Sequence, residues 1–154
     1  ESVMTLVGAD NGDAFDALTL TTPKRFRSGC NFVWYGEALD ESEIADGNIL
    51  VLKFDVSTNA VSGNYPVTIK YNDRDIFDAD LNPISIDIKN GEIKVNETTS
   101  DKPDQPIVPD EPEITEPTFV VNSVKANAGD PEVEVAINIV NNVSPIIFTV
   151  SLIV

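Results

Sequence analysis

The sequence contains no histidine, one cysteine (Cys30) and one tryptophan (Trp34) among its 154 residues. Without histidine there is no imidazole base, no Ser–His nucleophile pair and no His-ligated metal. One cysteine permits neither an intrachain disulfide nor a thiolate cluster. These absences remove the most frequent catalytic and zinc-binding arrangements from consideration.

Basic residues are also scarce, with 10 Lys and Arg against 26 Asp and Glu, for a formal charge of −16. A strongly anionic surface repels phosphate backbones and anionic lipid, so we expect neither nucleic acid nor membrane as a partner. The longest apolar runs, such as residues 49–52, fall far short of the ~20 residues of a membrane-spanning helix. No basic n-region follows Glu1, so no signal peptide is visible. We expect a piece of a larger secreted or cell-surface protein, since acidic, Thr/Asn-rich, Cys-poor sequences are common there.

Apolar and polar residues alternate along several segments, which is the pattern of half-buried β-strands. These segments are 50–56, 65–71, 84–88, 133–139 and 148–152. Turn sequences separate them: Asp46-Gly47-Asn48, Ser62-Gly63-Asn64, Asn90-Gly91 and Gly129-Asp130-Pro131. No segment has a convincing helical apolar stripe. The pattern therefore predicts an all-β fold with strand spacing typical of a β-sandwich.

The stretch from Asn96 to Thr118 interrupts this pattern. Its 23 residues hold five of the ten prolines, seven carboxylates and one Lys. Such a composition cannot form a core, and its prolines favour extended conformations. We interpret it as a linker between a body, residues 1–95, and a head, residues 119–154. Its charge is −6, which leaves −10 for the body and head together.

Neither flanking piece forms a complete domain by itself. The head has about three predicted strands and ends inside the apolar segment Ser151-Leu152-Ile153-Val154. Three strands cover too little apolar surface for a stable domain. The body in turn has too few strands to close a sandwich. The two pieces are therefore interpreted as one sandwich whose strands occur in a permuted order.

Ordered segments of both pieces resemble a cohesin module. In the body these are residues 46–56, 62–69 and 84–95; in the head they are 119–131, 133–135, 141–143 and 146–152. The resemblance covers about 131 residues, the body and head together. Cohesins are nine-stranded jelly-roll β-sandwiches on the scaffoldins of cellulosomes, where they bind calcium-loaded dockerin modules of enzymes. The resemblance thus implies a scaffoldin module with strands 4–9 in the body and strands 1–3 in the head.

Two questions of organisation stay open at this point. The permuted order fits a window across two tandem modules and fits a deliberate circular permutation equally well. The head could complete its own body, which tethering by the linker favours, or two chains could exchange heads in a domain-swapped dimer.

The resemblance also implies a partner face, made of strands 8, 3, 6 and 5. Strand 6 corresponds to residues 31–36, where Phe32 and Trp34 are expected to point inward. The residues expected to face a dockerin are Asn31, Val33 and Tyr35 on strand 6; Ile147, Thr149 and Ser151 on strand 3; Arg25, Phe26 and Arg27 on a predicted strand 5 at 24–27; and Leu81 beyond strand 8. An apolar and aromatic centre with a polar rim is typical of a protein interface.

Each of these residues also has a purely structural interpretation. Tyr35 could be a partly buried sandwich tyrosine, and Arg25 and Arg27 could be edge charges that oppose aggregation. Ile147 would belong to the core if the register slipped by one residue.

Neither a metal site nor catalysis is expected. Asp73, Asp75, Asp78 and Asp80 suggest calcium, but an EF-hand needs glycine at position 6 and glutamate at position 12 of its loop. Counting from Asp78 these positions hold Pro83 and Lys89, and from Asp73 they hold Asp78 and Ile84. Calcium is therefore expected on the dockerin, with no cofactor on this chain. No carboxylate pair stands out by its context as catalytic.

Two other functions stay open beside dockerin binding. A carbohydrate-binding sandwich would need a planar strip of exposed aromatic residues, and the chain has one Trp and three Tyr. A structural repeat of a cell surface would need no specific ligand.

Overall fold

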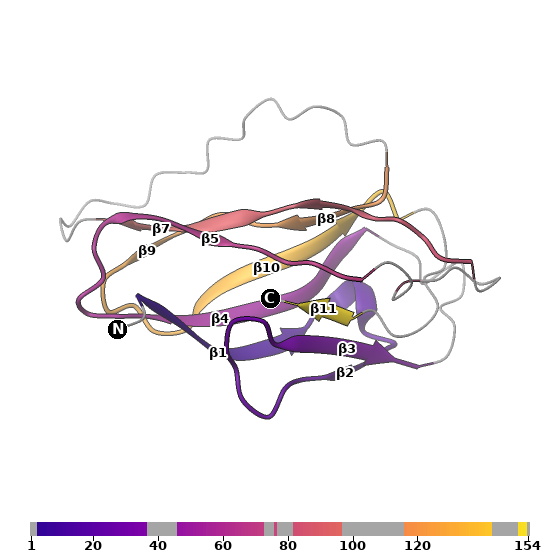
Figure 1. Cartoon of the computed structure of the whole chain (residues 1–154), viewed down its shortest axis with the longest axis horizontal. Coiled ribbons are helices and arrows are strands. Elements are labelled where there is room, and N and C mark those ends of the chain that lie inside the picture. The colour runs from indigo at the N-terminus through magenta and orange to yellow at the C-terminus, as the bar shows by residue number, and fades with distance from the viewer. Residues whose placement is uncertain are drawn as a thin grey trace.

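The computed structural model describes residues 3–36, 46–72, 76, 82–96, 116–142 and 151–153. The described residues are nearly all β, in sheets consistent with a β-sandwich, with no α-helix and one 3₁₀ turn, η1 (Asp13–Phe15). The predicted all-β class is confirmed. The strands run roughly along the long axis of the molecule (Figure 1).

The largest sheet has the strand order β1-β4-β10-β8-β6. Its strands are β1 (Met4–Asn11), β4 (Gly47–Val56), β10 (Val133–Val140), β8 (Thr118–Val121) and β6 (Asp87–Lys89). Neighbours are antiparallel except β6 and β8, which are parallel. Strands from 118–140 therefore pair within this chain with strands from 47–56 and 87–89.

Two three-stranded sheets complete the described structure. One has the order β11-β3-β2, from β11 (Ser151–Ile153), β3 (Asn31–Tyr35) and β2 (Thr19–Thr21). The other has the order β5-β7-β9, from β5 (Gly63–Val67), β7 (Gly91–Asn96) and β9 (Val124–Asn127). Asn96 ends β7 and Thr118 begins β8, so each end of the predicted linker extends one residue into a strand.

Two chain segments pass together from the large sheet into the sheet β5-β7-β9. The chain continues from β6 into β7 and from β8 into β9. β6 is parallel to β8 in the large sheet, and β7 is parallel to β9 in the sheet β5-β7-β9. At the passage a Cβ on Gly91 would lie 2.4 Å from the Val121 carbonyl oxygen, so the close backbone approach requires glycine there.

One apolar core receives side chains from all three sheets. Alternation predicts its members well: Leu52, Val135 and Ile137 are fully buried in the large sheet, and Phe32 and Trp34 are fully buried in β3. Two β-bulges modify the alternation. In β4 the register skips Ile49, so that Ile49 and Leu50 are both buried. In β1 the register skips Val7, whose side chain is exposed.

A polar anchor holds β3 against the end of β1. The indole N–H of Trp34 donates to Oδ1 of Asn11 at 2.6 Å. The Asn11 amide donates in turn to the carbonyls of Phe15 and Leu18, at 2.9 and 3.1 Å. One side chain thus satisfies three polar groups around η1, where the Phe15 ring meets Trp34 edge to face at 5.7 Å.

Replacing Asn11 with alanine leaves those three groups without this partner. Since each unsatisfied buried group costs ~1–3 kcal/mol, we expect Asn11→Ala to lower the free energy of unfolding by about 2–3 kcal/mol in urea denaturation. The control Asn64→Ala, at an exposed position of β5, should change it by less than about 0.5 kcal/mol. Equal effects of the two variants would contradict the anchor.

Candidate functional site

The outer face of the sheet β11-β3-β2 is the candidate binding face. In β3 Phe32 and Trp34 are buried, whereas Asn31 is exposed, Val33 is half-buried and Tyr35 is 54% exposed. The predicted alternation of this strand is therefore confirmed. Tyr35 is the one aromatic residue among the large exposed hydrophobic side chains of the described residues.

Strand register brings two threonines beside these residues. Thr19 lies opposite Tyr35, and Thr21 lies opposite Val33. On the other side of β3, Ser151 lies opposite Val33. The described face is therefore uncharged, formed by Thr19, Thr21, Asn31, Val33 and Tyr35, although charged residues make up 23% of the chain. Depletion of charge around an aromatic centre is the composition of an interface core.

The predicted strand at 24–27 is wrong. The strand that pairs with β3 is β2, which ends at Thr21, and residues 24–27 form a bend that leads into a turn. Continued pairing would place Pro23 in the ladder, where it has no N–H to donate. The turn is closed by the Cys30 N–H, which donates to the Arg27 carbonyl at 3.1 Å, with Gly29 at φ +79°.

In this bend Phe26 is more buried than predicted, whereas Arg25 and Arg27 are exposed as predicted. Phe26, expected to be exposed between charges, is half-buried, and its ring stacks on Phe32 with centroids 6.3 Å apart. Arg25 and Arg27 are exposed, as is Lys24.

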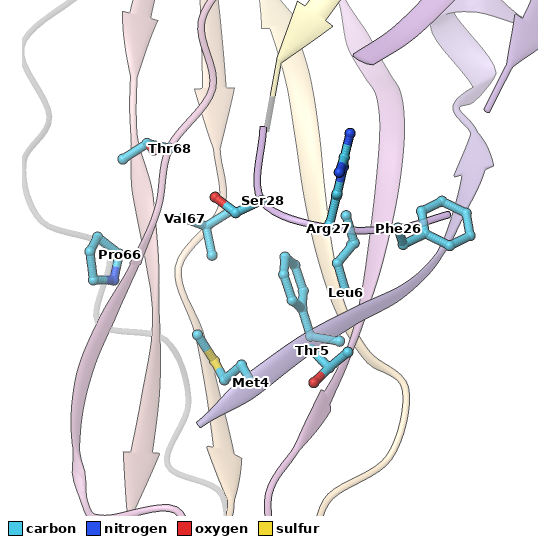
Figure 2. A pocket seen from close by; sticks show the side chains of 10 residues that line it. Met4, Thr5, Leu6, Phe26, Arg27, Ser28, Pro66, Val67 and Thr68 are labelled. Atoms are coloured by element: carbon cyan, nitrogen blue, oxygen red, sulfur yellow. The ribbon is translucent and has the colours of Figure 1, made fainter. Parts of the chain in front are cut away.

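An apolar groove opens beside this bend. It has a volume of about 390 Å³ and is lined by four segments: Met4, Thr5 and Leu6 of β1; Phe54 of β4; Phe26, Arg27 and Ser28 of the bend; and Pro66, Val67 and Thr68 at the end of β5. Figure 2 shows these segments around the groove, with the Arg27 side chain directed away from β1. Sequence patterns did not identify this groove, because its walls are far apart along the chain.

A second hollow, of about 520 Å³, is also lined by Arg27. Its lining consists of Pro23, Lys24, Arg25, Arg27, Gly29, Cys30 and Asn31. Arg27 therefore borders both hollows, and Asn31 connects the second one with the outer face of β3.

The cations of the bend contrast with Lys53 on the large sheet. The Lys53 ammonium lies 2.6 Å from a carboxylate oxygen of Asp10, and the hydrogen bond and charge of Asp10 raise its pKa above the ordinary lysine value. Glu132 and Glu134 raise this pKa further. Within the described parts of the chain, no carboxylate lies within ion-pair distance of Lys24, Arg25 or Arg27.

Several predicted residues lie outside the described structure. These are Leu81, Ile147 and Thr149 of the predicted face, and the aspartates at 73, 75, 78 and 80. Among the residues that the structure does describe, no group of three or more His, Cys, Asp or Glu side chains could hold a metal ion. Thr19 and Thr21 were not predicted as part of the face, although the short alternation Thr19-Leu20-Thr21 before Pro23 could have indicated them.

Comparison of this chain with known proteins assigns it no family. Family models, curated proteins and solved structures contain no match to this chain. No helix of the described residues is long and apolar enough to cross a membrane.

The Lys53 ion pair can be tested by titration. In Asp10→Asn the pKa of Lys53, followed by NMR of its side chain, should fall toward the ordinary value. Because the folded-state pKa is raised, the pair stabilises the fold below the ordinary lysine pKa, and this contribution is lost as pH rises through the folded-state pKa. A Lys53 titration identical in the variant and the parent would contradict the pairing.

Proposed function

We propose that this chain is a cohesin-like, non-catalytic module of an extracellular scaffoldin that binds a calcium-loaded dockerin. The proposed fold is the nine-stranded jelly roll, with strands 4–9 in residues 1–95 and strands 1–3 in residues 119–154. The face for the dockerin includes Asn31, Val33 and Tyr35. Calcium belongs to the partner, and this chain needs no cofactor.

The observation that carries the proposal is the order and surface of the sheet β11-β3-β2. In the numbering of the resemblance, β11 lies in strand 3 and β3 is strand 6, while β2 takes the place of strand 5. The order 3-6-5 is the one that the resemblance implies for the partner face. The uncharged surface around the exposed Tyr35 supports a role in protein binding on a chain of charge −16.

The pairing of the predicted strand 8 with strand 3 lies outside the described residues. The resemblance places strand 8 beside strand 3, of which the structure describes residues 151 and 152, and β5, at 63–67, pairs with β7. β5 also borders the apolar groove through Pro66, Val67 and Thr68. The described partner face is therefore narrower than the implied one, with β3 at its centre.

A carbohydrate-binding role has less support. Flat sugar surfaces stack on rows of exposed aromatic rings, whereas Trp34 is fully buried, as expected, and Tyr65 and Tyr71 are half-buried. Tyr71 is also engaged with Ile86, whose N–H donates to its hydroxyl at 2.6 Å. A single exposed tyrosine on the described surface favours a protein anchor over a sugar platform.

Calorimetric titration with a panel of calcium-loaded dockerins tests the proposal. We expect at least one dockerin to bind, and Tyr35→Ala and Val33→Asp each to weaken that binding at least tenfold, about 1.4 kcal/mol. Chelation of calcium should abolish binding without changing the melting temperature of this chain, because the ion belongs to the dockerin.

The control is Val61→Ala, which truncates an exposed hydrophobic residue at 70% exposure outside this face. It should bind like the parent, and all three variants should keep a cooperative melting transition. Heat with no dockerin of the panel would contradict the proposed function. Unchanged binding by both Tyr35→Ala and Val33→Asp would place the interface elsewhere.

A further inference from the structure

The bend between β2 and β3 concentrates positive charge on a strongly negative chain. Lys24, Arg25 and Arg27 are three of the ten basic residues, and all three are exposed. We call these three residues the cationic corner; they line one hollow of about 520 Å³. The described residues provide none of them with an ion-pair partner, although the chain has 26 carboxylates. Like charges close together repel one another, so an anionic ligand would relieve a repulsion that no carboxylate of the described residues offsets.

The apolar groove adjoins the cationic corner through Arg27, which lines both. Core residues form part of the groove wall. Leu6 and Phe54, two of its lining residues, are each 8% exposed. An apolar side chain placed in the groove would remove this surface from water, which stabilises a complex by roughly 25 cal/mol per Å².

The groove also lies between two sheet edges. β1 is at the edge of the large sheet and β5 at the edge of the sheet β5-β7-β9, in the described strand orders. Extended peptides bind at sheet edges, where backbone groups and alternate side-chain pockets are accessible. Pro66 of β5 lacks an N–H, so we assign the affinity to side chains rather than to a continuous backbone ladder.

From these observations we infer that the groove and the cationic corner together bind an extended acidic segment of a partner protein. An apolar side chain of that segment occupies the groove, and its neighbouring carboxylates contact Lys24, Arg25 and Arg27. Arginine pairs with carboxylates through two parallel hydrogen bonds, which adds orientation to charge attraction. This inference rests on the proposed function, because it takes a protein as the ligand. It adds that the part of the partner beside Asn31 is acidic, with one apolar side chain.

Charge complementarity selects this occupant over a polyanion. A nucleic acid or a sulfated polysaccharide carries a dense row of charges that the −16 of the chain would repel beyond the three cations. Such a polymer also has no apolar side chain for the groove. A short acidic peptide meets both features.

The test is fluorescence anisotropy with a labelled hexapeptide that has an Ile-Val pair flanked on each side by two acidic residues. We expect saturable binding to the full chain, weakened at least tenfold by Arg25→Ala/Arg27→Ala. Replacing the Ile-Val pair with Gly-Ser should weaken it at least fivefold, and raising salt from low to high concentration should weaken it severalfold because exposed charges are screened. A peptide with lysines in place of the acids should not bind.

The matched control is Lys94→Ala/Lys125→Ala, which removes the same two charges from an exposed cross-strand pair on β7 and β9. It should bind the acidic peptide within twofold of the parent. Equal losses in the two double variants would show non-specific attraction and overturn the inference, as would absence of binding. Equal affinity of the Gly-Ser peptide would overturn the role of the groove. Binding of heparin without competition by the peptide would assign the corner to a polyanion instead.

Comparison with the dockerin titrations separates the two proposals. Peptide binding by a chain that binds no dockerin would leave this inference standing and contradict the dockerin role. Dockerin binding without peptide binding would do the reverse.

Discussion

The pairing of β10 with β4 is the contact on which the rest of the structure depends. β10 lies between β4 and β8, so without it the large sheet separates into the pair β1-β4 and the pair β6-β8. The two strands are distant in sequence: the Glu132 N–H, one residue before β10, donates to Oδ1 of Asp55, near the end of β4, across 77 positions. Closing so long a loop costs entropy, which burial of Leu52, Val135 and their neighbours offsets.

The candidate site follows from this core. Because the large sheet presents a continuous apolar face, β3 buries Phe32 and Trp34 against it. The alternate residues Val33 and Tyr35 face outward. Asn11 fixes the position of β3 through the Trp34 indole. The bend that follows β2 is held to the same core by the stacking of Phe26 on Phe32, which leaves Arg25 and Arg27 in water. One core thus positions both the uncharged face and the cationic corner beside it.

The period-two pattern of the sequence predicted the buried faces of the main strands. The alternation in β3, β4 and β10 identified their buried faces, and the cluster of basic residues at 24–27 was visible in the sequence. Period two could not predict the bulges, where Ile49 and Val7 break the alternation because two residues oppose one. The strand expected at 24–27 came from the resemblance, and it is wrong because Pro23 has no N–H to continue the pairing of β2 with β3. The apolar groove depends on four segments that only tertiary packing brings together, so no local pattern predicts it.

An engineered disulfide can show whether β10 and β4 of the same chain are paired. Val51 and Ala136 lie directly opposite each other in the register, at a separation suited to a disulfide, and Cys30 is buried. In Val51→Cys/Ala136→Cys we expect oxidation to yield a crosslinked monomer of 16.7 kDa on a non-reducing gel, independent of protein concentration. A disulfide-linked species of about twice that mass would show that the strands are exchanged between chains, and failure to crosslink at all would contradict the pairing itself.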